Sequence, residues 1–288
     1  MTRYSLAKIG FDLEGSGAQL DALRREFAGF EDDLAARPAH IRFRFVDALG
    51  ELDAYVSIPP LKAAEGIYEV TQGALAYQVR AGKPGFEVSI RAGNQVSVQD
   101  ILEEVVDPLL QFVHLENDTT FLPASSFEKD GRAVALVGWG AANESTSLVE
   151  QMSEDGWRPL SDDLAMINRN GILSPNRGHA ARATKLTDLF MVERASVTAL
   201  KLRSLSVPDA ARQAVARLLS RLQRCVRHAT ALHGGSYFPI LARPDDFYQN
   251  GFNIIRQGFA AQNPSLLTMP INAGADELAR FLRQKLRA

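Results

Sequence analysis

The fold of this chain is decided by residues 132–167, RAVALVGWGAANESTSLVEQMSEDGWRPLSDDLAMI. An apolar run at 133–137 ends at Gly138, which is typical of a strand buried on both faces. A glycine turn and a helical stretch follow, and then a short extended run at 157–160. This order predicts a strand–turn–helix–strand unit of an α/β protein.

The turn occupies the frame of a phosphate-binding loop, G-x-x-x-x-G-K-[ST], at residues 138–145. Gly138 and Ser145 match the frame, whereas Asn143 replaces its second glycine and Glu144 its lysine. Asparagine can keep the backbone geometry, because it visits positive φ more readily than most residues. Glu144 reverses the charge, and unit charges about 4 Å apart interact by roughly 4 kcal/mol at an effective dielectric near 20. We therefore expect weak phosphate binding in the usual pose, unless a metal ion lies between the two.

Two acids, Asp162 and Asp163, stand between the extended run at 157–160 and an apolar run at 164–167. Paired acids at a strand edge near a phosphate loop are placed to hold Mg²⁺ or to accept a proton from a hydroxyl. Ser145 could supply a hydroxyl ligand to the same ion. The alternative is that GWGAANEST is an ordinary glycine turn between a strand and a helix.

Together these residues resemble the core of the HPr kinase and phosphoenolpyruvate carboxykinase-like P-loop proteins. The family pattern is a strand, G-x-x-G-x-G-K-[ST], a helix, a glycine-bearing turn and a strand ending in Asp-Asp. The run FLPASSFE at 121–128 is similar to the strand before the family's loop, with Pro123 where the family often carries histidine. The resemblance covers about residues 121–177.

The resemblance implies an HPr kinase C-terminal-like P-loop domain at 116–288, preceded by a small α+β region at 1–115. It implies that Asp162 is the catalytic residue, as proton acceptor or metal-organising acid, and that Asp163 and Ser145 bind the metal. ATP and Mg²⁺ are the cofactors of an active member, and a degenerate member needs neither. The residues expected at the nucleotide are Gly138, Gly140, Asn143, Glu144, Ser145, Thr146 and Arg177.

Three functions follow as hypotheses. The first is a degenerate member, a pseudokinase with a binding, regulatory or scaffold role. The second is an active ATP-dependent kinase for a protein serine or threonine, or for a small hydroxyl compound, in which Arg177 or Lys185 replaces the lost lysine. The third is an unrelated α/β binding domain. A protein partner or substrate is expected for the first two.

Composition bounds these hypotheses. The chain has 288 residues, a formal net charge of −2 and 46% hydrophobic residues, as expected for a globular protein without general affinity for nucleic acid or membranes. The N-terminal residues lack a signal-peptide pattern, so a cytoplasmic protein is expected, and a homo-oligomer stays open. The single cysteine, Cys225, excludes an internal disulfide and is expected to be a packing residue.

Periodicity predicts the remaining elements. Helices are expected at 18–36, 98–113, 209–233 and 275–287, and strands at 4–13, 42–47, 53–58, 66–77, 86–91, 236–244 and 266–271. Pro108 is expected to kink the second helix, and the helix dipole to favour His114 at its C-terminal end. An Asn-Gly hairpin turn is expected at 168–171. The arginines of 209–233 are expected to form a solvated face.

Overall fold

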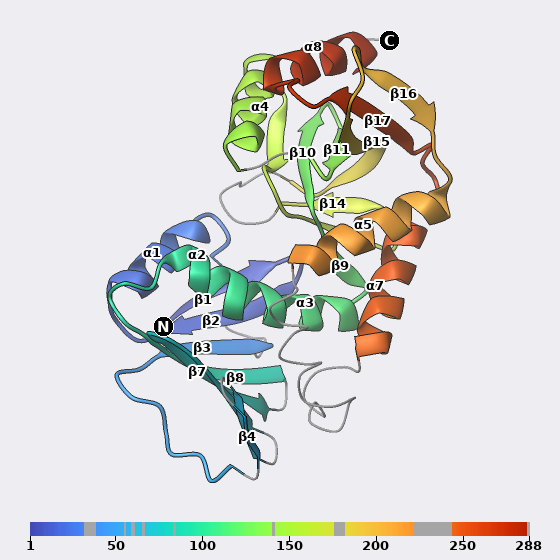
Figure 1. Cartoon of the computed structure of the whole chain (residues 1–288). Coiled ribbons are helices and arrows are strands. Elements are labelled where there is room, and N and C mark those ends of the chain that lie inside the picture. Colours follow the sequence, from blue (N-terminus) through green and yellow to red (C-terminus); the bar gives the residue numbers. More distant parts are fainter. Residues whose placement is uncertain are drawn as a thin grey trace. The chain divides into compact units, whose positions relative to one another are not determined.

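The computed structural model of the chain (Figure 1) describes residues 1–31, 39–54, 56–58, 61–64, 67–82, 85–139, 142–175, 182–221 and 244–286. The chain divides into two compact units, Met1–Asn117 with Arg221–Tyr248, and Asp118–Ser220 with Gln249–Ala288. Each unit combines helices with a sheet, which confirms the prediction of a mixed α/β protein. None of the described helices is long and apolar enough to cross a membrane.

The first unit is built on an eight-stranded sheet in the order β1-β2-β3-β8-β7-β6-β5-β4. Its strands are Thr2–Leu6, Ile9–Glu14, Ile41–Phe45, Val56–Ile58, Leu61–Ala64, Ile67–Gln72, Leu75–Gly82 and Gly85–Ala92, numbered β1 to β8. Neighbours are antiparallel except at β2–β3 and β3–β8. Buried aromatic rings of the first three strands pack together, with the Phe11 centroid 5.4 Å from Tyr4 and 6.1 Å from Phe43.

Two stretches expected as single strands are hairpins. Residues 4–13 turn at Ala7 and Lys8, which have positive φ angles of 45° and 74°. The sequence carries a signal for this turn, because the alternation of apolar and polar residues changes phase between Leu6 and Ile9. These two residues lie opposite each other across the hairpin. Residues 66–77 likewise turn at Gly73.

The two helices predicted in the first unit differ from expectation in length and regularity. The predicted helix at 18–36 is α1 (Ala18–Glu26), which ends before Gly29 with its φ of 90°. The predicted helix at 98–113 consists of α2 (Val98–Ile101), a π-helical turn η1 (Leu102–Val106) and α3 (Asp107–Glu116). The irregular turn directly precedes Pro108, because proline has no N–H to donate to the carbonyl four residues earlier.

The second unit is built on a nine-stranded sheet in the order β12-β10-β11-β15-β14-β13-β9, with β17 joining β15 to β16. Strands β9 to β17 are Thr119–Leu122, Ala124–Lys129, Arg132–Val137, Arg158–Ser161, Ala165–Asn168, Ile172–Ser174, Thr184–Ala195, Lys201–Ser204 and Ser265–Pro270. Among the described strands of this sheet, β11–β15 and β15–β17 are the parallel pairs. The long central strand β15 was not predicted, although its run LFMV is a buried-strand pattern.

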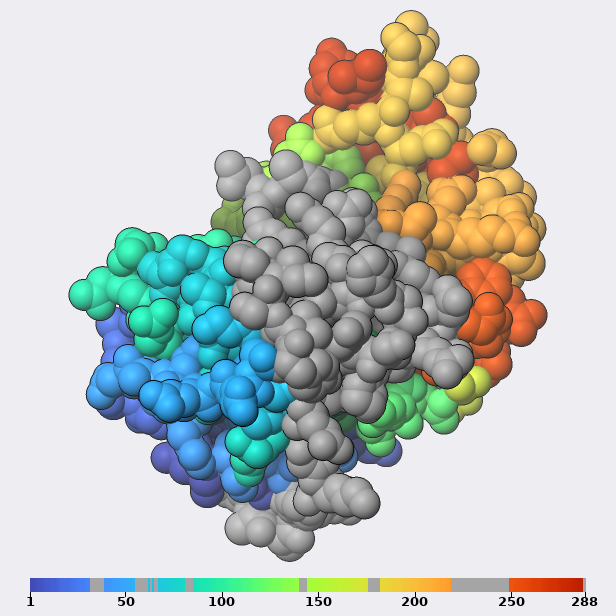
Figure 2. Space-filling view, turned by 60° about the horizontal axis from the view of Figure 1, so that its bottom comes forward, coloured from blue at the N-terminus to red at the C-terminus, as the bar shows by residue number. Residues whose placement is uncertain are grey.

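Helices cover both faces of the β10–β11–β15–β17 part of this sheet. One buried cluster joins it to α4 (Ala142–Glu154) and α8 (Ala275–Leu286), which lie side by side in Figure 1. The other joins it to α5 (Val207–Arg221) and the end of α7 (Pro244–Gly258). Figure 2 shows the surface of α5, in light orange, beside the red-orange surface of α7.

Three further expectations for the second unit need comment. The strand expected at 121–128 is broken at Pro123, and its halves β9 and β10 pair with different strands, because proline offers no N–H to a ladder. The Asn-Gly turn is confirmed, with the Asn168 side chain accepting from the N–H of Asn170 at 2.9 Å. The helix expected at 209–233 is described only to Arg221, so Cys225 and the strand at 236–244 lie outside the described residues.

Candidate functional site

The predicted loop frame begins directly after β11. Gly138 has a φ of 81°, and its N–H donates to the carbonyl of Pro123 at 3.1 Å. Helix α4 begins at Ala142, so Asn143, Glu144, Ser145 and Thr146 lie in its first turns. Gly140 lies outside the described residues. Asn143 therefore has a helical backbone and does not adopt the positive φ angle that glycine would provide at this position.

Glu144, at the lysine position, is paired with an arginine of the central strand. The Arg194 guanidinium donates to Glu144 Oε2 at 2.6 Å and to the carbonyl of Ile271 at 2.7 Å. The same group lies 5.1 Å from the ring centroid of Trp139, a cation–π contact. The negative charge at the loop position is thus neutralised within the protein, at the overhanging end of β15.

Trp139, the second residue of the frame, is a core residue. It is 5% exposed and packs in the cluster that contains Leu148 and Met152 of α4. Its indole N–H is buried without an acceptor among the described residues. A large apolar side chain therefore fixes the start of the loop frame against α4.

The paired acids lie at the same end of the sheet as Gly138, beyond the carboxyl ends of β12 and β11. Asp162 follows the end of β12, and its carbonyl accepts from Ser125 Oγ at 2.6 Å, while the N–H of Asp163 donates to Ser161 Oγ at 3.1 Å. Strand β10 alone separates β12 from β11, so the two strand ends are about 10 Å apart by strand spacing. Both aspartates are half-buried.

The proposed metal ligands fit Mg²⁺ only in part. Ser145 is buried and Asp163 is half-buried, and a hydroxyl with one or two carboxylates is a donor set that Mg²⁺ takes beside phosphate oxygens. Among the residues described, no three His, Cys, Asp or Glu side chains are grouped to hold a metal. A magnesium ion here would depend on a nucleotide for its remaining ligands.

Of the two cations considered as substitutes for the lysine, only Lys185 lies among the described residues. Arg177 lies outside the described ranges. Lys185 is at the start of β15, where its ammonium donates to the carbonyl of Asn170. The register pairs Ala133 with Leu186 and Val137 with Met191, so Lys185 lies at the opposite end of the sheet from Gly138, about 20 Å away along the strand. The suggestion that Lys185 replaces the lysine is therefore wrong.

Two arginines that sequence reasoning did not place here do reach the end of the sheet at Gly138. Arg194 lies over Trp139, and Arg217 of α5 lies against Gly138. Arg217 was expected on a solvated helix face, yet its guanidinium donates to the carbonyls of Val137 and Val192. The sequence carries no local signal for either role, because each depends on pairing across the sheet.

A pocket of about 460 Å³ lies beside Glu144 at the N-terminal turns of α4 and α8. Its lining comprises Glu144, Ser147, Gly274, Ala275, Asp276, Glu277 and Arg280. Three of these residues carry carboxylates and one carries a guanidinium. Acids near helix N-termini are favoured by the dipole, but this surface would repel the phosphates of a nucleotide.

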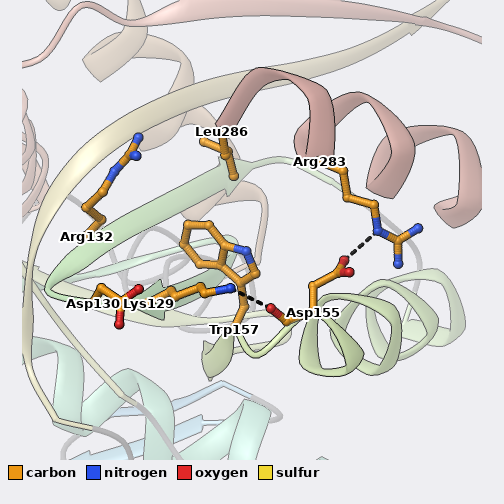
Figure 3. A pocket seen from close by; sticks show the side chains of 7 residues that line it. All are labelled: Lys129, Asp130, Arg132, Asp155, Trp157, Arg283 and Leu286. Carbon is orange, nitrogen blue, oxygen red and sulfur yellow. Dashed lines mark hydrogen bonds and ion pairs between the residues drawn. The ribbon is translucent and has the colours of Figure 1, made fainter. Parts of the chain in front are cut away.

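A second pocket, of about 220 Å³, lies near the β10–β11 turn (Figure 3). In Figure 3 the Trp157 ring stands between Leu286 and Lys129. The Lys129 ammonium donates to the carbonyl of Asp155 at 2.7 Å, and Arg283 donates to the Asp155 carboxylate at 2.5 Å and to the carbonyl of Gln151 at 3.3 Å. These cations meet the carbonyls at the C-terminal end of α4, which is a structural role.

A scan against protein-family models finds no match to this chain, and a search of the curated proteins finds none either.

Proposed function

We propose that this chain is a degenerate HPr kinase-like protein, a pseudokinase that serves as a binding, regulatory or scaffold protein. The observation that supports this best is the ion pair between Glu144 and Arg194. A lysine at this position would meet phosphate oxygens, whereas Glu144 meets a guanidinium that is itself anchored to the carbonyl of Ile271.

The surroundings support the same proposal. Phosphoryl transfer is mostly positioning and charge stabilisation at the transferred group. Here the neighbouring pocket adds Asp276 and Glu277 to Glu144. A triphosphate approaching α4 would therefore meet acids where a kinase presents cations.

The second candidate is an active ATP-dependent kinase, and one observation favours it. Asp162 and Asp163 lie at the same end of the sheet as Gly138 and the guanidinium of Arg217. In that case Asp162 would take the proton of the substrate hydroxyl, and Asp163 with Ser145 would hold Mg²⁺ beside the phosphates.

Calorimetric titration with ATP, with and without Mg²⁺, tests the proposal. The natural chain is expected to show no binding up to about 1 mM, the upper end of usual Michaelis constants. The double variant Asn143→Gly, Glu144→Lys is expected to gain Mg²⁺-dependent binding, because a phosphate can then separate the new lysine from Arg194. The matched control is Glu150→Lys, the same charge change at an exposed position of α4, which should gain nothing.

Micromolar binding of ATP with Mg²⁺ by the natural chain would contradict the pseudokinase proposal and favour the kinase. Loss of that binding in Asp163→Asn would then assign the metal. If neither the natural chain nor the double variant binds ATP, the result would favour an unrelated α/β binding domain.

A further inference from the structure

Arg217 occupies an unusual place at the end of β11. One of its terminal nitrogens donates to the carbonyl of Val137, and the other donates to the carbonyl of Val192 at 2.7 Å. A Cβ atom on Gly138 would lie 2.0 Å from Nη1 and 2.3 Å from Cζ of this guanidinium. Glycine is required at 138 both for this close approach and for its positive φ.

No carboxylate in the described part of the chain forms an ion pair with Arg217. Burial lowers the pKa of its guanidinium, and the nearby charge of Glu193 opposes that effect without forming an ion pair. Glu193 instead accepts a hydrogen bond from Thr268 Oγ1 at 2.8 Å. Both partners of Arg217 among the described residues are neutral carbonyls, and a partly buried cation without a counterion is costly.

Other arginines of the same unit, even more exposed ones, are paired with carboxylates. Arg194 is paired with Glu144, Arg283 with Asp155, and Arg132 with Asp188. Arg217, which is less exposed than Arg132 and Arg194, has no such carboxylate partner among the described residues.

The position is also one where a ligand is expected. The carboxyl end of β11 lies at Arg217 beside Val192 of its parallel neighbour β15, and open α/β sheets bind ligands at the carboxyl ends of parallel strands. Helix α5 lies on the opposite sheet face from α4, which carries Glu144. The guanidinium is therefore on the other side of the sheet from the acidic pocket.

We infer that Arg217, with the end of β11 and the adjacent Val192 of β15, forms a binding site for a small oxyanion of the phosphate type. A guanidinium carries five N–H donors, and two are used by Val137 and Val192, so three remain for the oxygens of the anion. The anion would supply the counterion that the described residues lack. This inference does not depend on whether the chain binds a nucleotide.

The test follows the Arg side-chain Nε–H signals of the ¹⁵N-labelled full chain during titration with potassium phosphate against potassium chloride at equal ionic strength. The Arg217 signal, identified by its absence in Arg217→Lys, is expected to shift saturably. Phosphate binding should also raise the thermal midpoint of unfolding, and the concentration dependence of that rise gives an apparent affinity. Arg217→Gln should lower this apparent affinity at least about tenfold. Arg212→Gln is the matched control, because Arg212 is an exposed arginine on the same helix and is paired with Asp209.

The outcomes separate this inference from the pseudokinase proposal. Saturable binding of phosphate but not of ATP with Mg²⁺ supports both the oxyanion site and the pseudokinase proposal. A saturable Arg217 shift with ATP and Mg²⁺ as well keeps the oxyanion site and overturns the pseudokinase. An Arg217 signal that shifts no more than that of Arg212 overturns the oxyanion site, and does so on the natural chain even where Arg217→Gln fails to fold.

Discussion

At the scale of single residues, burial decides what a charged group does in this chain. His114 shows this in the first unit. Sequence reasoning expected it at the C-terminal end of a helix, where the dipole favours it, and it does lie in the last turn of α3. The residue is also fully buried, and desolvation, with a smaller effect of His40, lowers its pKa to about 3. A dipole contribution of about 0.3–1 kcal/mol is smaller than the cost of burying the charge, so the neutral imidazole is favoured.

This residue gives a pH prediction. The folded-state pKa of His114 lies below its ordinary value of 6.5, so its stabilising contribution is fully present above that value and is lost as the pH falls towards 3. The free energy of unfolding should fall by up to about 1.4 kcal/mol per pH unit in this window. Urea denaturation followed by circular dichroism at about pH 7.5 and about pH 5 measures it.

His114→Gln is the control for the pH experiment, because glutamine keeps a polar side chain that does not titrate. The pH dependence of the variant should be shallower than that of the natural chain. Parallel curves for the two proteins would show that His114 does not carry the effect.

At the scale of elements, the β10–β11 hairpin aligns the strand that leads to the loop frame. Lys129 and Arg132 are paired across a two-residue turn in which Asp130 and Gly131 have φ angles of 52° and 78°. Two positive φ angles define a type I′ turn, which matches the twist of the strands and favours Asp-Gly. The Asp-Gly pair at 130–131 is therefore a sequence signal for this hairpin, although no turn was predicted there.

Gly131→Ala tests the hairpin. A Cβ atom there meets nothing within 4 Å, so the cost is purely conformational and should be about 1 kcal/mol in the free energy of unfolding. Gly131→Asn should cost less, because asparagine tolerates the left-handed region better. Equal losses for the two variants, measured by urea denaturation, would contradict this conformational account.

Local patterns predicted the unit from β11 to β13, because a buried strand, a helix and a turn each leave a contiguous signature. They did not predict β15 as the central strand, nor Arg194 and Arg217 at the site. Arg194 lies 50 residues from Glu144 along the chain, and Arg217 lies 80 residues from Val137. Such partners are set by strand order and register, which a single sequence does not display.

At the scale of the whole molecule, the two compact units have separate cores. Phe11, fully buried, anchors the first with ring centroids 4.9 Å from Phe27 and 5.4 Å from Tyr4. Leu282 of α8 is equally buried in the second.

Phe11→Ala should destabilise the first unit by about 3–5 kcal/mol. Hydrogen exchange read by mass spectrometry should then show faster exchange in β1 to β3 and unchanged protection in β11 and β15. Leu282→Ala is the mirror control, with losses confined to the second unit. Loss of protection in both units from either variant would contradict separate folding units.

The chain has two tryptophans, and both belong to the second unit. Trp139 is buried just after the end of β11, and Trp157 is half-exposed in the pocket near the start of that strand. Intrinsic fluorescence excited at the indole band therefore reports on this unit alone. With Trp157→Phe, the remaining emission becomes an optical probe of the residue directly beside Gly138 and Arg194.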